Sequence, residues 1–288
     1  MDIYGLIGHP VKHSLSPAMH NAAFQENGLN AQYKLFDVSP DKLKDFFTAP
    51  GYSITDIEGN SFFVSDIKGF NVTVPYKEAV IQFIELDKEK EYLKKVKAVN
   101  TVLNKDGKFK AVNTDIFGFS RDLFEHFDFN MCDAVVLGAG GAARAVTYAL
   151  AMKARSIAIF DIDISKSFGI KDMIKNIFPN FNVSVAESVE QLNIYDKTLL
   201  VNTTPVGMKE GDVSVVDKKM LHKKLFIYDI VYNRKTRLLI DAEEKGLKVV
   251  NGLGMLLYQG VLAWEEWIGR PAPVEVMRKA LYKEIYNV

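Results

Sequence analysis

The segment D-A-V-V-L-G-A-G-G-A-A-R, residues 133–144, decides the fold of this chain. Residues 134–137 form a short, valine-rich apolar run that ends at a glycine, as a buried parallel strand does. Gly138, Gly140 and Ala143 then fit the pattern Gly-x-Gly-x-x-Ala, and the residues that follow favour a helix. This order of strand, glycine turn and helix predicts a binding site for the pyrophosphate of a dinucleotide.

Each small residue of this turn has a physical role in the prediction. Gly138 permits the tight turn, Gly140 lets the backbone approach a phosphate, and Ala143 lets the helix pack on the strand. The free N–H groups at the helix N-terminus favour an anion. The same pattern also occurs as a simple tight turn, so its context decides between the two readings. An acid is required about 20 residues further on, and Asp161 ends a second apolar run at residues 156–160.

Composition and charge exclude several classes of protein. The 288 residues suffice for two domains, and 48% hydrophobic residues indicate buried cores. Lys plus Arg and Asp plus Glu each number 36, so no basic excess points to nucleic acid or a membrane. Cys132 is the single cysteine, which excludes an internal disulfide, and the five histidines lack metal-ligand spacing. We expect a cytoplasmic, metal-free monomer or homodimer that binds a small molecule.

The chain before residue 116 predicts an α/β domain. Residues 50–66 predict a loop or short hairpin, and residues 98–113 predict a hairpin because Asp106-Gly107 is a strong turn signal. A helix is expected from about residue 114 to about residue 127. The three expected strands, each followed by a helix, are residues 3–7, 32–38 and 69–75.

Polar side chains lie at two expected helix starts in this domain. Ser16 before Pro17 predicts an N-cap with proline at the first helical position. Ser14 and Ser16 would then offer hydroxyls beside free N–H groups, which suits a carboxylate. Lys77 falls at the start of a helix expected over residues 76–86, where the helix dipole disfavours a cation. Both placements indicate function; simple capping and simple solvation are the alternatives.

The chain after residue 116 predicts a doubly wound parallel sheet, because strands and helices alternate. The segment at residues 202–207, Asn-Thr-Thr-Pro-Val-Gly, follows a strand at the carboxyl edge, where such sheets bind ligands. The six expected strands are residues 134–137, 156–160, 182–185, 197–202, 225–229 and 247–250.

Two final helices, residues 251–267 and 273–286, have no strand partner and are expected to return to the first domain. The resulting prediction is a two-domain α/β protein. Its three parts are a substrate-binding and catalytic domain at residues 1–115, a dinucleotide-binding Rossmann domain at 116–250, and C-terminal helices at 251–288 that pack on the first domain.

Seven blocks of this chain resemble the shikimate dehydrogenase family, in the family's order and across almost the whole length. The resemblance implies reversible oxidation of the C3 hydroxyl of shikimate to 3-dehydroshikimate with a nicotinamide cofactor. The blocks are S-L-S-P-A-M-H-N (14–21), N-V-T-V-P-Y-K (71–77), A-V-N-T (98–101), N-T-D (113–115), G-A-G-G-A-A-R (138–144), Y-D-I-V-Y-N (228–233) and N-G-L-G-M-L-L-Y-Q-G (251–260).

The resemblance also implies site residues. Lys77 and Asp115 match the catalytic pair, while Ser14 and Ser16 would hold the substrate carboxylate with Tyr232 close by. The ring hydroxyls would meet Thr73, Asn100 and Gln259. The pyrophosphate would meet Gly138, Ala139, Gly140, Gly141, Ala142 and Arg144, and the nicotinamide side would be lined by Thr203, Ile230, Gly252 and Met255.

The reaction itself asks for a base. Removing hydride from a secondary alcohol also releases the hydroxyl proton, and neutral Lys77 is one acceptor. An ordinary lysine has a pKa of about 10.4, and an adjacent Asp115 carboxylate favours its charged form, whereas desolvation opposes it. Lys77 is therefore either the direct base or an orienting group while Asp115 or water takes the proton. In the reverse direction its ammonium is a natural general acid.

The nucleotide domain departs from the family at residues 161–166. Many members carry Asn-Arg-Thr-x-x-Arg there, whose arginines grip the 2′-phosphate of NADP, but this chain has Asp161, Ile162 and, at the last position, Lys166. An acid at the strand end binds the ribose of NAD and repels a phosphate, by about 1 kcal/mol per charge pair in water. NAD is the expected cofactor and NADP the alternative, unless Asp161 only caps a turn.

Three other functions compete with shikimate oxidation. NAD-preferring relatives often accept quinate and serve catabolism rather than aromatic biosynthesis, but paired serines at 14 and 16 favour shikimate. A binding or regulatory protein would be expected to lack Lys77 or Asp115, and both are present. A dehydrogenase acting on a folate or an amino acid would not need the serine pair together with those two residues.

Overall fold

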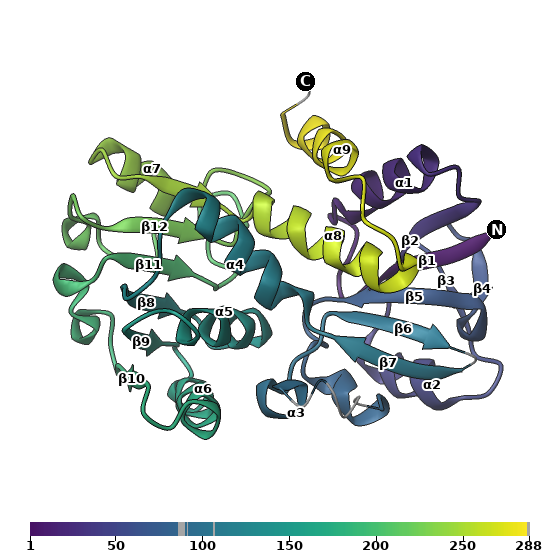
Figure 1. Ribbon diagram of the computed structural model, residues 1–288, viewed down its shortest axis with the longest axis horizontal. Coiled ribbons are helices and arrows are strands. Elements are labelled where there is room, and N and C mark those ends of the chain that lie inside the picture. The colour runs from purple at the N-terminus through teal and green to yellow at the C-terminus, as the bar shows by residue number, and fades with distance from the viewer. Residues whose placement is uncertain (86–89, 91, 106, 287–288) are drawn as a thin grey trace. The chain divides into compact units, whose positions relative to one another are not determined.

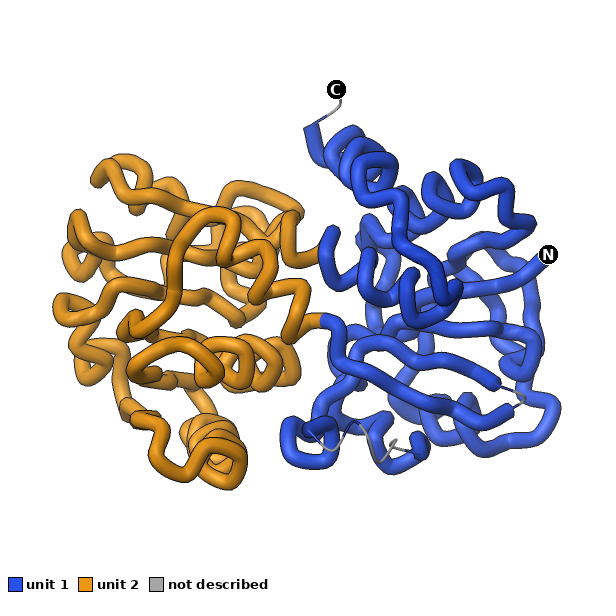
Figure 2. Tube along the Cα trace, in the orientation of Figure 1, with its two compact units in different colours: residues 1–114, 257–288 blue, residues 115–256 orange. Residues whose placement is uncertain are grey.

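The computed structural model describes residues 1–85, 90, 92–105 and 107–286 (Figure 1). The chain forms two compact units (Figure 2): the first comprises Met1–Thr114 and Leu257–Val288, and the second comprises Asp115–Leu256. Helices α4 (Thr114–His126) and α8 (Leu253–Ile268) carry the chain from one unit to the other. The second boundary lies within α8, a few residues after the expected position at residue 250.

A five-stranded mixed sheet organises the first unit, in the order β2-β1-β5-β6-β7. Strand β1 (Asp2–Gly8) pairs in parallel with β2 (Ala31–Asp37) and β5 (Ile67–Val72), whereas β6 (Thr101–Lys105) and β7 (Lys108–Val112) are antiparallel. The carboxyl ends of β1 and β5 and the amino end of β6 therefore meet at one edge. We call it the carboxyl edge of the first sheet.

Helices cover both faces of this sheet. Neighbouring residues of β5 point to opposite faces, and each face packs against a helix. A Cβ at Gly69 would lie 2.5 Å from Nε1 of Trp267, so glycine lets this tryptophan of α8 pack on one face. Phe70 meets Phe46 of α2 on the other face, with ring centroids 5.2 Å apart. The remaining helices and short strands are α1 (Ser16–Glu26), η1 (Pro40–Lys42), α2 (Leu43–Thr48), β3 (Ser53–Thr55), β4 (Ser61–Phe63), η2 (Val64–Asp66), η3 (Ala79–Phe83), α3 (Tyr92–Val96) and α9 (Val274–Tyr286).

Two local predictions for this unit are wrong. The helix expected over residues 76–86 is only the short 3-10 helix η3, and Leu86 lies outside the described residues. The Lys77 carbonyl accepts the Val99 N–H at 2.9 Å, a bond to a distant residue rather than one within an α-helix. Lys77 therefore lies in a turn and not at a helix start. Ser16 is the first residue of α1 and does not cap it; Ser14 Oγ instead accepts the Ser16 N–H at 3.3 Å.

Two hairpins join the antiparallel strands. Strands β3 and β4 form the short hairpin that was one of two expectations for residues 50–66. Strands β6 and β7 pair from Thr101 and Val112 to Lys105 and Lys108, as the turn signal indicates. Asp106 of that signal lies outside the described residues.

A six-stranded parallel sheet organises the second unit, in the order β10-β9-β8-β11-β12-β13. This order confirms the doubly wound fold, and the topological switch lies between β8 and β11, where dinucleotides bind. Helices α5 and α6 pack against β8, β9 and β10, whereas α7 packs against β12 and β13. The elements are β8 (Asp133–Leu137), α5 (Gly141–Ala151), β9 (Ser156–Phe160), α6 (Ile164–Ile177), β10 (Asn182–Val185), η5 (Glu190–Leu192), η6 (Ile194–Asp196), β11 (Leu199–Asn202), η7 (Lys218–Met220), β12 (Phe226–Asp229), α7 (Arg237–Glu244) and β13 (Val249–Asn251).

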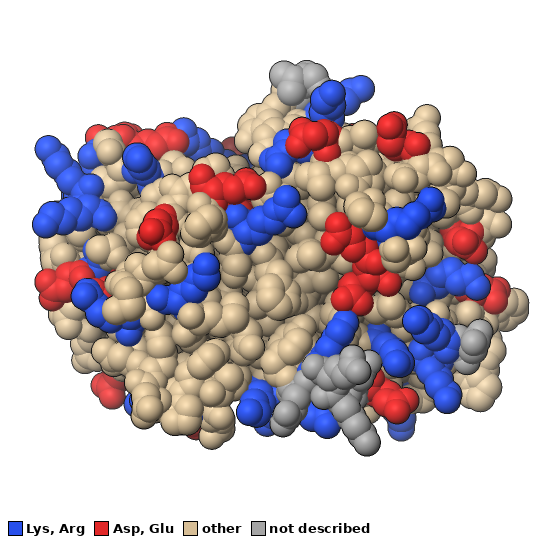
Figure 3. Space-filling model, in the orientation of Figure 1, with Lys and Arg blue, Asp and Glu red and all other residues tan. Residues whose placement is uncertain are grey.

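Both charge types are spread over the face shown in Figure 3, on each unit, as equal numbers of acidic and basic residues lead one to expect. Across the described ranges, no helix combines the length and the apolar character needed to cross a bilayer.

His20 of α1 is a buried base in the first unit. Its ring stacks on Tyr33 with centroids 4.5 Å apart, and neither ring nitrogen has a hydrogen-bond partner within the described part of the chain. Burial lowers the pKa of His20 to about 3, whereas an unfolded histidine titrates near about pH 6.5. Between these values the unfolded chain binds a proton that the folded chain does not, so the free energy of unfolding falls as pH falls.

Replacing His20→Phe should therefore flatten the loss of stability between about pH 6.5 and about pH 4. We expect the slope to decrease by up to about 1.4 kcal/mol per pH unit. Urea unfolding at a series of pH values measures it, and His13→Phe, at an exposed position, is the matched control. Equal slopes in the wild type and the His20 variant would contradict the assignment.

Candidate active site

The glycine loop joins β8 to α5 and has the geometry of a phosphate cradle. Gly138 has φ +97°, and a Cβ there would lie 2.7 Å from Thr203 Oγ1, so glycine is required where the loop meets the end of β11. Gly140 is the N-cap of α5, and a Cβ there would have no neighbour within 4 Å. Backbone N–H groups at a helix start beside open space suit a pyrophosphate.

Asp161 fastens this loop to the end of β9. Its Oδ2 accepts the Ala139 N–H at 2.7 Å, and its Oδ1 accepts the Asp163 N–H at 2.8 Å. Asp161 therefore does cap a turn, which was the alternative to its binding a ribose. This capping does not use up the carboxylate, because each oxygen offers two lone pairs. Lys166 lies 3.8 Å from Asp163 Oδ2, and the Ile162 side chain is 97% exposed.

A buried carboxylate holds the loops after β11 and β12. Asp229 accepts from Asn202 Nδ2 at 2.9 Å and from Thr236 Oγ1 at 2.7 Å, and it also accepts the Val231 N–H. Burial raises the pKa of Asp229 to about 6. These bonds fix the residues on either side of Asp229 at the carboxyl edge of the second sheet.

The residues expected around the nicotinamide gather at this edge. A Cβ at Gly252 would collide with the Ile230 carbonyl oxygen, so these two backbones touch. Thr203 lies against Gly138, and its hydroxyl donates to the Leu137 carbonyl at 2.6 Å. Met255 follows in the first turn of α8. Gly141, Ala142 and Arg144 lie in the first turn of α5, and the Arg144 guanidinium reaches Met173 Sδ at 3.6 Å.

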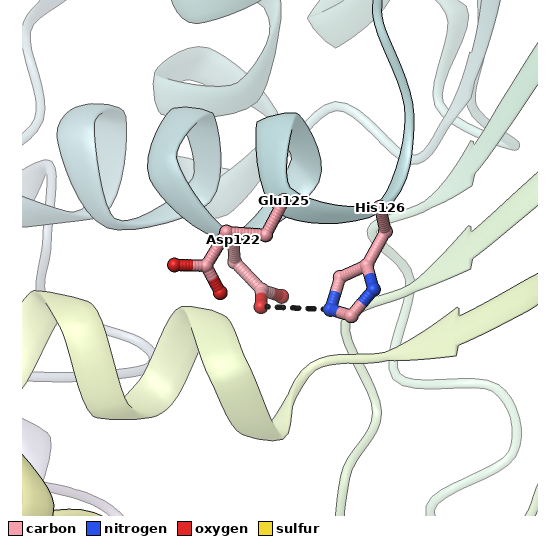
Figure 4. Close-up of side chains that lie close together, drawn as sticks. All are labelled: Asp122, Glu125 and His126. Carbon is pink, nitrogen blue, oxygen red and sulfur yellow. Dashed lines mark ion pairs between the residues drawn. The ribbon is translucent and has the colours of Figure 1, made fainter.

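Asp122 of α4 is another buried carboxylate in this unit, which the sequence did not single out. It accepts the Tyr228 hydroxyl at 2.5 Å, and burial raises the pKa of Tyr228 well above its usual value. Asp122 and His126 lie 3.6 Å apart (Figure 4), and with Glu125 they offer ligand atoms within 4.8 Å of one another. Because Tyr228 already engages Asp122, we interpret the group as a structural tie between α4 and β12.

Ser14 and Ser16 lie in the loop that follows β1. The Ser14 N–H donates to the Val11 carbonyl at 3.0 Å, and the Ser14 hydroxyl accepts the Ser16 N–H at 3.3 Å. Ser16 is buried, and Ser14 is half-buried. The loop thus presents two hydroxyls at the carboxyl edge of the first sheet.

Asn100 is the centre of the polar residues at this edge. Its Oδ1 accepts the Thr114 N–H at 2.7 Å, and its Nδ2 donates to Thr114 Oγ1 at 2.9 Å and to Gln259 Oε1 at 3.3 Å. Thr73 follows β5, and its N–H donates to the Ile7 carbonyl at 2.9 Å. The Val99 bond to the Lys77 carbonyl ties Lys77 to the residue before Asn100. Five expected substrate residues and Lys77 thus belong to one unit.

The other two expected catalytic and substrate residues, Asp115 and Tyr232, belong to the second unit. Asp115 directly follows Thr114 in α4 and is buried. Tyr232 lies in the loop after β12, where burial raises the pKa of its phenol.

The sequence missed Asn71 and Thr101, which are buried beside Asn100. Asn71 Nδ2 donates to the Asn100 carbonyl at 3.1 Å and to Thr101 Oγ1 at 2.9 Å. The available signal is an asparagine inside the otherwise apolar run before Thr73, because a buried amide must find partners.

These features define a class of protein: a two-domain dehydrogenase with a doubly wound nucleotide unit and a separate unit whose sheet carries hydroxyl and amide side chains at its carboxyl edge. The chain belongs to the shikimate dehydrogenase family. The family's substrate binding domain matches residues 6–102, and the shikimate 5'-dehydrogenase C-terminal domain matches residues 252–282.

Full-length relatives support this assignment. A shikimate dehydrogenase (NADP(+)) of Methanopyrus kandleri is 42% identical over 99% of this chain and 96% of its own length. The shikimate 5-dehydrogenase of Listeria monocytogenes, solved in complex with shikimate and NAD, is 34% identical with a TM-score of 0.82, over 98% and 96% of the two chains. A quinate dehydrogenase of Corynebacterium glutamicum in complex with NAD is 29% identical with a TM-score of 0.84, over 98% and 99%.

The glycine loop yields a paired test. Gly140→Ala adds a methyl group to open space, so the stability should stay within about 0.5 kcal/mol while the KM for the nicotinamide cofactor rises several-fold. Gly138→Ala forces a side chain into a left-handed conformation against Thr203, so the protein should lose at least about 1 kcal/mol of stability. Thermal unfolding and cofactor KM measure both. A normal cofactor KM for Gly140→Ala would argue against a phosphate at this loop.

Proposed function

We propose that this protein oxidises the C3 hydroxyl of shikimate to 3-dehydroshikimate, reversibly, with NAD or NADP. The observation that carries the proposal is the set of hydroxyl and amide side chains at the carboxyl edge of the first sheet, centred on Asn100 and Gln259. Such side chains suit a small ring that bears several hydroxyls, and full-length relatives named shikimate dehydrogenase support the choice.

We assign the ring hydroxyls to Thr73, Asn100 and Gln259. The contact between Asn100 Nδ2 and Gln259 Oε1 is long, at 3.3 Å. A substrate hydroxyl both donates and accepts, so it replaces this contact and bridges the two amides. The carboxylate is assigned to Ser14 and Ser16, because the Ser14 hydroxyl can accept the Ser16 N–H and still donate a bond, and Tyr232 is the third candidate.

Bound NAD or NADP would be held by the glycine loop after β8 and would supply the hydride acceptor for C3. The hydroxyl proton is taken by Lys77 directly, or by Asp115 or water while Lys77 orients the hydroxyl. In the reverse direction the Lys77 ammonium gives a proton to the new alkoxide. The bond from Val99 to the Lys77 carbonyl fixes the backbone from which the ammonium extends. Lys77 and Asp115 are therefore the proposed catalytic pair.

Replacing Lys77→Ala should reduce kcat by about 10²- to 10⁴-fold, because it removes the proton-transfer group. Shikimate binding, measured by calorimetry, should change much less. Asp115→Asn should also lower kcat, and Lys44→Ala, at an exposed position of α2, is the matched control. A Lys77→Ala variant with a near-normal rate would remove Lys77 from the mechanism.

We further propose that NAD is the preferred cofactor. Asp161 directly follows β9, and the exposed Ile162 stands where the family resemblance implies an arginine for the 2′-phosphate. Two features oppose this preference: Asp161 also holds the glycine loop, and the Methanopyrus relative is named for NADP(+). Lys166 adds a cation near the same strand end, although it lies close to Asp163.

Initial rates with shikimate and with quinate, each with NAD and NADP, test the preference. We expect the highest kcat/KM for shikimate with NAD. Quinate turnover at a comparable rate would favour the dual-substrate alternative, which the similarity to a quinate dehydrogenase makes worth testing.

Ile162→Arg should shift the ratio of kcat/KM values towards NADP by about tenfold, the effect of one new charge pair at a modest effective dielectric. Its side chain is exposed, so the change should not disturb packing. Met152→Arg, at the opposite end of α5 from the glycine loop, adds the same charge as a control. An unchanged ratio in Ile162→Arg would remove residues 161–162 from cofactor selection.

A further inference from the structure

Tyr33 lies on the edge strand β2, and contacts from α1 hold both its backbone and its ring. The Asn21 side chain of α1 bonds both of its backbone groups, accepting the Tyr33 N–H at 2.7 Å and donating to the Tyr33 carbonyl at 3.4 Å. The His20 ring stacks on the Tyr33 ring with an interplanar angle of 5°. The ring is buried, so its hydroxyl points into the unit rather than to solvent.

The Tyr33 hydroxyl donates to Asn71 Oδ1 at 2.8 Å. The other end of that amide donates to the Asn100 carbonyl and to Thr101 Oγ1. The orientation of the amide is fixed, because a carbonyl only accepts and Asn71 Nδ2 must face it. Tyr33 then supplies the donor that the buried Oδ1 requires, and without it this oxygen would lose its partner.

The network continues from Asn71 to the proposed substrate residues. Thr101 Oγ1 lies 3.1 Å from Thr114 Oγ1, and the Thr114 N–H donates to Asn100 Oδ1. Asn100 in turn reaches Gln259. Its inner members, Asn71, Asn100, Thr101 and Thr114, are buried. A displacement of the Asn71 amide would therefore be transmitted to the Asn100 side chain and to Thr114, the residue before Asp115.

We propose that Tyr33 is a positioning residue for the substrate. Its hydroxyl holds Asn71, and Asn71 holds Asn100 and Thr101 in the geometry that receives the ring hydroxyls. Tyr33 itself does not touch the substrate. This inference rests on the proposed function, since it concerns the residues assigned there to shikimate.

Tyr33→Phe removes only the hydroxyl and keeps the ring that stacks on His20. We expect kcat/KM for shikimate to fall about tenfold, as for a buried acceptor left without its donor, mainly through a higher shikimate KM. The cofactor KM should stay within about twofold, since every network member belongs to the first unit. Tyr4→Phe is the matched control: Tyr4 is also buried in β1, and its hydroxyl has no protein partner among the described residues.

A second variant tests whether Tyr33 acts through Asn71. In an Asn71→Ser background, Tyr33→Phe should cause no further loss, because coupled residues are not additive. Additive losses would overturn the inference, as would a Tyr33→Phe enzyme that matches Tyr4→Phe. Equal increases in both KM values with a lower Tm would also overturn it, because they indicate a purely structural role. If the wild-type enzyme oxidises no shikimate, the proposed function fails instead, which separates the two failures.

Discussion

The first unit depends on the hydrogen bond from the Thr114 N–H to Asn100 Oδ1, at 2.7 Å. It joins the amino end of β6 to the start of α4, one of the two helices that link the units. Because both groups are buried, neither can exchange this partner for water without a cost of about 1–3 kcal/mol. The same amide is the proposed contact for the substrate, so the bond that starts the helix also orients the site.

The second unit combines stability and function in a similar way at Asp161. Its carboxylate bonds the backbone of the glycine loop and of the next turn, and it is also the residue that we propose for the ribose of the cofactor. A substitution of Asp161 would therefore disturb the glycine loop as well as the proposed cofactor contact. Cofactor preference is therefore better tested at its exposed neighbour Ile162, which has no such structural duty.

The parts of the fold that the sequence predicted depend on local signals. The run at residues 134–137, Gly138 and the following helix are contiguous, so their order is readable before any tertiary contact is known. The Lys77 turn was not readable, because it depends on a bond from Val99. The hydrogen bond between Tyr33 and Asn71 joins residues 38 positions apart, and the periodic spacing of apolar residues does not predict such a pair. The site residues therefore stay a prediction that comes from resemblance, whereas the contacts among them required the structure.

We propose that the first unit presents C3 of shikimate as the hydride donor. The most direct measurement uses shikimate with deuterium at C3 and follows the label by mass spectrometry of the reduced cofactor. We expect the reduced nicotinamide to carry one deuterium and the shikimate to be converted to 3-dehydroshikimate. Reduced cofactor without deuterium would place the oxidised carbon elsewhere on the ring, and the absence of any reduced cofactor would contradict the proposed function.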